Sequence, residues 1–110
     1  METGQNDKII QLLEYNNIDK TTIDMIKKRM EVGMERYGHG LCIHHDTRKW
    51  GTTNDSWEEM ALEELSDGLV YMAAAILRLD ATKRNDAKIQ NLTQILNDMM
   101  QITAHLHNSQ

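Results

Sequence analysis

Acidic side chains recur at helical spacing in the middle of the chain. Glu64 and Asp67 are three residues apart and Tyr71 follows four residues later, so in a helix the three side chains project from one stripe. Apart from Gly68, the residues that follow Asp67 form an apolar stretch, LVYMAAAIL. Burying a carboxylate in such surroundings without a partner would cost roughly several kcal/mol of solvation free energy. A cation would offset that loss. Because Mg²⁺ prefers carboxylate oxygens and keeps several waters, Glu64 and Asp67 are candidate magnesium ligands.

A second acidic pair precedes the first. Glu31 and Glu35 are four residues apart, which puts them on one helix face and makes them candidates for the opposing wall of the same metal site. A simpler interpretation remains open. Asp24 with Lys28, and Lys27 with Glu31, have the spacing of ordinary ion pairs on an exposed helix.

The histidine-rich segment between these pairs carries two weaker signals. His44, His45 and Asp46 are consecutive, as in HD-type phosphohydrolases, but such a site needs a further His and Asp, which only His39 or Asp67 could supply. Histidines that contact phosphate are the simpler interpretation. Cys42 lies near three histidines and could be a nucleophile, but no further triad signature accompanies it, and a small, half-buried loop thiol is the favoured interpretation.

Four helices are expected to position these groups. Apolar residues recur at three- and four-residue steps in segments beginning at Asp7, at Thr21 or Thr22, at Ser56 and at Ile89. Tyr15, Tyr37-Gly38, Leu79 and Ile102 mark where these patterns end. Thr21 or Thr22 is the predicted cap of the second helix, and Ser56 with Glu59 forms a capping box for the third. A polar break is predicted over 80–86, and 38–55 is predicted to be a binding loop.

Composition agrees with an all-α fold. The chain has 110 residues, no Pro and no Phe, and many Met, Leu, Ala, Glu and Lys residues. This length favours one domain over residues 1–110, with a core small enough to need oligomerisation. The formal net charge is −5, without the basic cluster that duplex nucleic acid requires. No apolar run could span a membrane, and the lone cysteine fits a reducing cytoplasm.

Three segments together resemble one family. RMEVGMERYGHG, the Trp-containing loop, and SWEEMALEELSDGLVYMAAAIL are similar to MazG-like all-α nucleoside triphosphate pyrophosphohydrolases, particularly the small forms of phages and other viruses. The resemblance spans Ile23 to Leu79. The family's ExxD motif is matched by Glu64 to Asp67. Its ExxE motif is matched by Glu31 to Glu35 with one extra intervening residue, so Glu59 or Glu63 could complete the ligand set instead.

The resemblance implies a four-helix MazG-like bundle completed by formation of a homodimer or homotetramer, in the host cytoplasm if the protein is viral. It implies Mg²⁺-dependent hydrolysis of a nucleoside triphosphate, particularly a deoxynucleotide, to the monophosphate and pyrophosphate, with Mn²⁺ as an alternative ion. The implied metal ligands are Glu31, Glu35, Glu64 and Asp67. Of these, Glu35, Glu64 and Asp67 are the catalytic candidates, and one glutamate would also activate water.

A bound triphosphate carries about four negative charges, and the protein is itself acidic, so positively charged side chains are needed near the phosphates. A surface for the nucleotide base is needed as well. The candidates are Lys28, Arg36, Tyr37, Arg48, Lys49, Trp50 and Tyr71. Arg48 and Lys49 would pair with phosphate while Trp50 stacks on a base. Alternatively, Trp50 and Tyr37 pack the loop against helix ends.

Two other classes of function stay open. A non-catalytic module could sequester a nucleotide, although an acidic stripe is a poor surface for an anion without a metal. A plain helical interaction module would use the carboxylates only for solubility and would show no Mg²⁺-dependent thermal shift.

Overall fold

The computed structural model describes residues 3–82 and 86–110, and every regular element in that part of the chain is helical. The all-α prediction is therefore confirmed. The chain divides into two compact units, Met1–His45 and Asp46–Gln110, and each is described by itself. The predicted single domain and the MazG-like bundle stay predictions.

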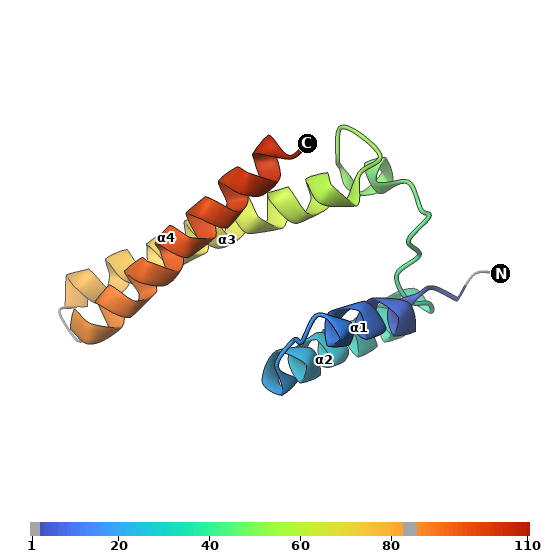
Figure 1. The fold of residues 1–110 in the computed structure, drawn as a ribbon, viewed down its shortest axis with the longest axis horizontal. Coiled ribbons are helices and arrows are strands. Elements are labelled where there is room, and N and C mark those ends of the chain that lie inside the picture. Colours follow the sequence, from blue (N-terminus) through green and yellow to red (C-terminus); the bar gives the residue numbers. More distant parts are fainter. Residues whose placement is uncertain (1–2, 83–85) are drawn as a thin grey trace. The chain divides into compact units, whose positions relative to one another are not determined.

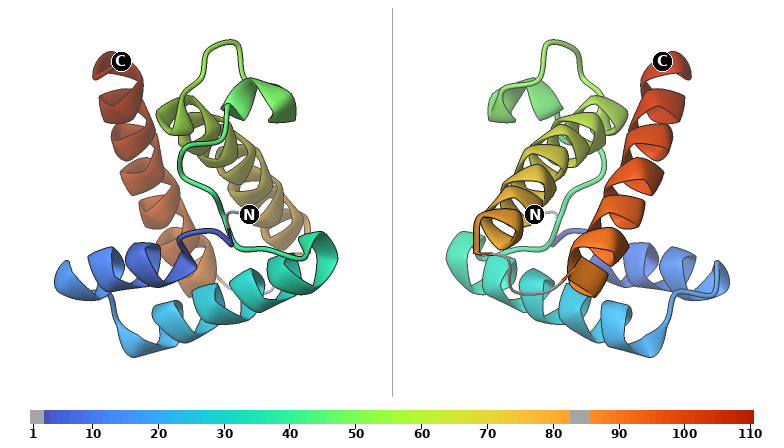
Figure 2. Two further views of the ribbon diagram at one scale, coloured as in Figure 1. Left: turned by 90° about the vertical axis from the view of Figure 1, so that its right-hand side faces the viewer. Right: turned by 90° about the vertical axis from the view of Figure 1, so that its left-hand side faces the viewer.

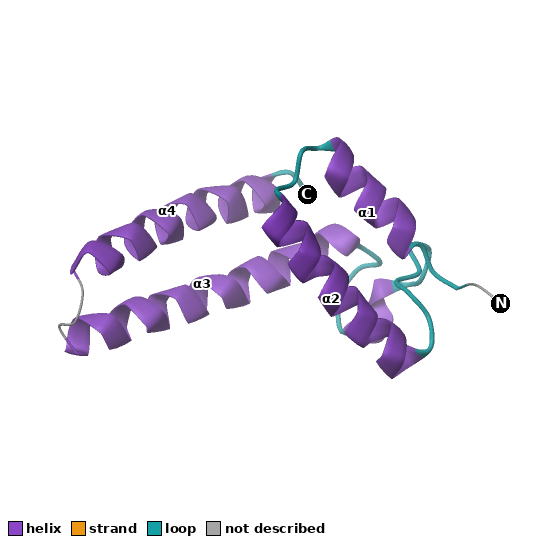
Figure 3. Ribbon diagram, turned by 90° about the horizontal axis from the view of Figure 1, so that it is seen from below, coloured by secondary structure: helices purple, strands orange, loops and turns teal. Residues whose placement is uncertain are grey.

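The first unit is a pair of helices, α1 (Asn6–Tyr15) and α2 (Lys20–Tyr37), which lie side by side in Figures 1 and 3. Asn16 and Asn17 make the tight turn between them, with Asn17 at a φ of 64°, a left-handed conformation that asparagine tolerates. Ile23 is the one residue of α2 that is buried.

The start of α2 differs from the prediction. The N-cap is Asp19, whose carboxylate accepts hydrogen bonds from the Thr22 N–H at 3.0 Å and the Thr22 hydroxyl at 2.6 Å. The predicted caps Thr21 and Thr22 are wrong, because both residues already lie inside the helix. These hydrogen bonds, the one from the Thr22 side chain first, lower the pKa of Asp19. The predicted end at Tyr37 is confirmed: Gly38 has a φ of 77° and donates its N–H to Met34.

The second unit contains a short 3₁₀ helix, η1 (Thr47–Trp50), and two long helices, α3 (Trp57–Thr82) and α4 (Asp86–Asn108). The two long helices lie side by side (Figure 1). The predicted 80–86 break begins later than expected, since α3 continues to Thr82, and residues 83–85 lie outside the described part. Half-buried side chains line one stripe of each long helix: Leu62, Leu65, Leu69, Met72 and Ile76 on α3, and Leu92, Leu96, Met99 and Leu106 on α4.

Gly68 lies in the stripe of α3 that faces α4. A Cβ atom at this position would come within 3.2 Å of the Met99 Cε atom. The missing side chain therefore lets Met99 pack closely against the α3 backbone, at a site where glycine weakens the helix itself.

The other faces of these helices carry apolar side chains in contact with solvent. No residue of α3 or α4 is classed as buried, and Val70, Tyr71 and Leu77 are 65%, 71% and 68% exposed. Within this unit α3 and α4 pack along one stripe each, which leaves most of the girth of each helix open. None of the described helices combines the length and apolar character needed to cross a membrane.

Candidate functional site

The acidic stripe of α3 forms as the sequence predicts. Glu64, Asp67 and Tyr71 lie on consecutive turns and all three are exposed, on the side of the helix away from the half-buried Leu65 and Leu69. Of the apolar residues that follow, Val70 and Leu77 are exposed too, whereas Leu69, Met72 and Ile76 are half-buried. The desolvation expected at Asp67 therefore does not arise within the described chain, and the stripe is an open surface of alternating carboxylate and apolar groups.

The acidic pair of α2 belongs to the first unit. Glu31 and Glu35 are both exposed and four residues apart on α2, so they share a face as predicted. Asp24 pairs with Lys20 at 3.0 Å, so the predicted ion pair of Asp24 with Lys28 is wrong. Because α2 and α3 are in different units, the proposed meeting of the two acidic pairs stays a prediction.

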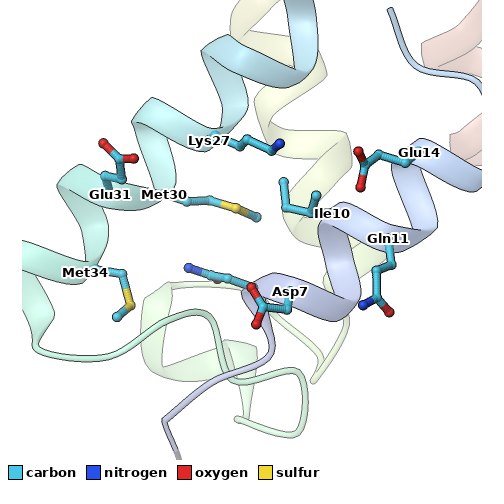
Figure 4. A pocket seen from close by; sticks show the side chains of 9 residues that line it. Asp7, Ile10, Gln11, Glu14, Lys27, Met30, Glu31 and Met34 are labelled. Carbon is cyan, nitrogen blue, oxygen red and sulfur yellow. The ribbon is translucent and has the colours of Figure 1, made fainter. Parts of the chain in front are cut away.

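Glu31 also lies at the rim of a hollow between α1 and α2, with a volume of about 450 Å³. Figure 4 shows Ile10 and Met30 pointing toward one another across this space, with the Lys27 amine beside them and the Glu31 carboxylate turned away. The hollow is lined by Asn6, Asp7, Ile10, Gln11, Glu14, Lys27, Met30, Glu31 and Met34. Its floor is apolar, and three of its rim groups are carboxylates.

The described residues supply only some of the ligands that a divalent ion needs. Within residues 3–82 and 86–110, no three or more His, Cys, Asp or Glu side chains gather as a metal site. Glu64 and Asp67 alone offer two hard oxygen donors one helical turn apart, whereas Mg²⁺ takes about six oxygens. The donor type suits Mg²⁺, and waters, substrate phosphates and carboxylates from another helix would have to supply the remainder.

Glu59, an alternative ligand, is engaged in holding the loop. Its carboxylate accepts hydrogen bonds from the Thr53 N–H and from Asn54, whose side-chain amide lies 3.2 Å away. Its own N–H donates to the Ser56 hydroxyl at 3.0 Å. This half of the predicted capping box is confirmed, while the carboxylate ties down the loop before α3 rather than closing the box on Ser56.

Thr47 is the centre of that loop. It is the only described side chain that is fully enclosed, at 0% exposure. Its hydroxyl accepts from the Ser56 N–H at 2.7 Å and lies 2.8 Å from the Thr52 hydroxyl, which donates to the Asn54 carbonyl at 2.6 Å. Its N–H donates to the Asp55 carboxylate at 3.1 Å. The predicted binding loop is therefore ordered by a buried hydroxyl network.

Arg48, one of the predicted substrate contacts from this loop, is already paired. The Arg48 guanidinium donates to both Asp46 carboxylate oxygens, with the shortest distance 2.6 Å. This contact, together with the Arg48 N–H, lowers the pKa of Asp46 to about 2 and raises that of Arg48. An Asp46 held in this way is a cap for η1, which weakens the comparison with an HD metal site.

The Trp50 indole stacks on Trp57, with ring centroids 5.8 Å apart and planes inclined by 29°. No role is predicted for Trp57 from the sequence, and the signal that points to one is an aromatic residue directly after the Ser56 cap. Trp50 is still 51% exposed. The packing interpretation of Trp50 is thus supported, and one part of the indole remains open for a ligand.

The remaining predicted contacts are separate surface groups. Lys28, Arg36 and Tyr37 are exposed on α2, and Lys49 is exposed on η1. In the loop after α2, the Cys42 thiol is 3% exposed and lies 3.7 Å from His39 Nδ1 and 3.6 Å from the Gly40 carbonyl. Cys42 is more enclosed than the predicted half-buried thiol.

No protein-family model, curated protein or solved structure matches this chain.

Proposed function

We propose that this chain is a Mg²⁺-dependent nucleoside triphosphate pyrophosphohydrolase. The observation that carries the proposal is the exposed Glu64–Asp67 pair, two carboxylates one turn apart on a long helix. The resemblance of three sequence segments to MazG-like enzymes supports the same reaction. Bordering apolar groups would exclude water from this stripe once another helix covers it, and carboxylates hold a cation more firmly in such surroundings.

The reaction breaks the anhydride linkage between the α and β phosphates. A water oxygen bonds to phosphorus, the bridging P–O bond breaks, and the monophosphate and pyrophosphate leave. A bound Mg²⁺ would neutralise charge on the phosphate oxygens. Glu64 and Asp67 would hold that ion with Glu31 and Glu35, and a glutamate, Glu35 for example, would take the proton of the attacking water.

The basic side chains that would contact the triphosphate differ in whether they already have a partner. Lys49 is exposed next to the ordered loop, and Lys28 and Arg36 are exposed on α2. Arg48 would have to leave or share its carboxylate partner. The open part of the Trp50 indole offers a stacking surface for the base, at the rim of the same loop.

A homodimer or homotetramer is part of the proposal. Val70 and Leu77, seven residues apart, form an exposed apolar strip on α3, and a second copy packed there would complete a four-helix arrangement. Sedimentation of the wild-type chain is expected to give a dimer or tetramer, and a monomer at micromolar concentration would contradict this part.

The deciding experiment is pyrophosphate release from a panel of deoxynucleoside triphosphates with Mg²⁺ and, separately, with Mn²⁺. Asp67→Asn and Glu64→Gln are each expected to lower turnover by at least about a hundredfold, with unchanged helical circular dichroism because both side chains are exposed. Asp80→Asn is the matched control on the same helix and is expected to retain activity.

Undiminished activity in Asp67→Asn would overturn the assignment of the site. Wild-type protein that gains thermal stability with a nucleotide and Mg²⁺ yet releases no pyrophosphate would favour the alternative, a module that binds nucleotides without hydrolysing them.

A further inference from the structure

The segment before α1 is joined to the loop after α2 by hydrogen bonds at both backbone and side-chain level. The Gln5 N–H donates to the Leu41 carbonyl at 2.7 Å, and the Gly40 N–H donates to the Thr3 carbonyl at 2.9 Å. Figure 2 shows the two segments running alongside one another. Together these bonds pair residues that are more than thirty positions apart in the sequence.

Side chains extend the same pairing. The Asn6 side-chain oxygen accepts from the Leu41 N–H at 2.9 Å, and the Gln5 side-chain oxygen accepts from the Ile43 N–H at 2.9 Å. The loop therefore has three of its N–H groups and one carbonyl occupied by the segment 3–6. Such a run of amides would otherwise depend on water.

Two glycines make this close approach possible. Gly4 has a φ of 95°, and a Cβ atom there would lie 2.5 Å from the Gly40 carbonyl carbon. A Cβ atom at Gly40 would lie 2.8 Å from the Asn6 side chain. A side chain at Gly4 would meet the Gly40 backbone and force the segments apart, whereas a side chain at Gly40 would displace the Asn6 amide that accepts from the Leu41 N–H.

The position of this contact in the chain gives it a consequence. The first unit ends at His45 and the second begins at Asp46, where the Asp46 carboxylate caps η1. Only His44 and His45 lie between the residues held by segment 3–6 and that cap. The His45 N–H itself donates to the Cys42 carbonyl at 3.0 Å, which shortens the free part further.

We propose that residues 3–6 act as a clasp that holds residues 40–43 and so limits the connection between the two units to about two residues. When the clasp is closed, residues 40–43 are held within the first unit. When it opens, residues 38–45 all join the connection and lengthen the reach between α2 and the second unit. The proposal does not depend on nucleotide hydrolysis, because it concerns only contacts within the first unit.

The single cysteine of the chain reports on the clasp. Cys42 is buried and lies between Leu41 and Ile43, whose backbones the clasp holds. Thiol labelling with an aromatic disulfide reagent at fixed pH therefore proceeds through opening. Asn6→Ala removes one side-chain hydrogen bond, and labelling is expected to accelerate about fivefold. Gly4→Ala keeps every bonding side chain, adds the clash with Gly40, and is expected to give at least about a tenfold increase.

Gln11→Ala is the matched control, an exposed amide on α1 outside the clasp, and should leave the rate unchanged. Amide hydrogen exchange is the second measurement. Protection at Leu41 and Ile43 is expected to fall in Asn6→Ala and Gly4→Ala, while protection in the middle of α2 stays at the wild-type level. Labelling and exchange equal to wild type in both variants would overturn the clasp. Loss of protection throughout α2 would also overturn it, since the segment would then support the whole unit.

Discussion

The buried hydroxyl of Thr47 provides the sharpest test of how the loop before α3 is held. Thr47→Val keeps the shape of the side chain and removes only the hydroxyl. The Thr47 hydroxyl accepts from the Ser56 N–H and has three acceptors within reach of its one hydrogen: the Thr52 hydroxyl at 2.8 Å, the Asn54 carbonyl at 3.1 Å and the Ser56 carbonyl at 3.3 Å. The substitution therefore removes two hydrogen bonds at a site with no exposure to solvent.

Each such bond contributes about 1 kcal/mol net, so the free energy of unfolding should fall by about 2 kcal/mol. It should fall by up to about 4 kcal/mol if the Ser56 N–H finds no water in its new surroundings. The chain's two tryptophans, Trp50 and Trp57, are stacked beside this network. Their fluorescence during urea denaturation is therefore a local readout, and the midpoint should drop by roughly 1 M.

Two further variants make the result interpretable. Thr53→Val changes an exposed threonine in the same loop and should alter stability by less than about 0.5 kcal/mol. Thr47→Ser retains the hydroxyl and should recover most of the loss. Equal midpoints for Thr47→Val and Thr53→Val would refute the claim that the hydroxyl network stabilises the loop.

Two more predictions concern charge and helix packing. The pKa of Asp46 is lowered from 3.8 to about 2, so the folded state binds a proton less readily than the unfolded one. The stabilisation from Asp46 should be complete above about pH 4 and disappear as the pH falls toward 2. The ¹³C chemical shift of the Asp46 carboxyl should change over that range of pH. An ordinary aspartate pKa for Asp46 would contradict its pairing with Arg48. Gly33→Ala should stabilise α2 by up to about 1 kcal/mol because nothing lies within 4 Å of the new Cβ atom. Gly68→Ala should stabilise α3 by less, because its Cβ atom meets Met99 at 3.2 Å. Amide hydrogen exchange in α2 and α3 measures both effects, and equal gains in protection would contradict the prediction.

The sequence by itself determined the helices and the pairs of acidic residues within them. Apolar residues at three- and four-residue steps specify a helix whatever it packs against. The helix ends are local too: α2 ends at Tyr37 because Gly38 adopts a left-handed conformation, and the Ser56 hydroxyl caps α3 by accepting from the Glu59 N–H. The spacing of Glu64 and Asp67 likewise fixes their shared face, since helical geometry is local. The cap of α2 was mispredicted because Asp19, Thr21 and Thr22 are all good caps, and only the hydrogen bonds formed distinguish them.

Tertiary structure decided which polar groups serve the fold. Nothing local in the sequence distinguishes Thr47 from Thr53, yet one is enclosed and the other exposed. Nothing in the sequence separates Glu59 from Glu63 as a ligand, whereas in the structure the Glu59 carboxylate accepts from the loop amides. The pairing of Gln5 with Leu41 joins residues far apart in the chain. Such contacts depend on how distant segments meet in space, which periodicity and spacing along the chain do not encode.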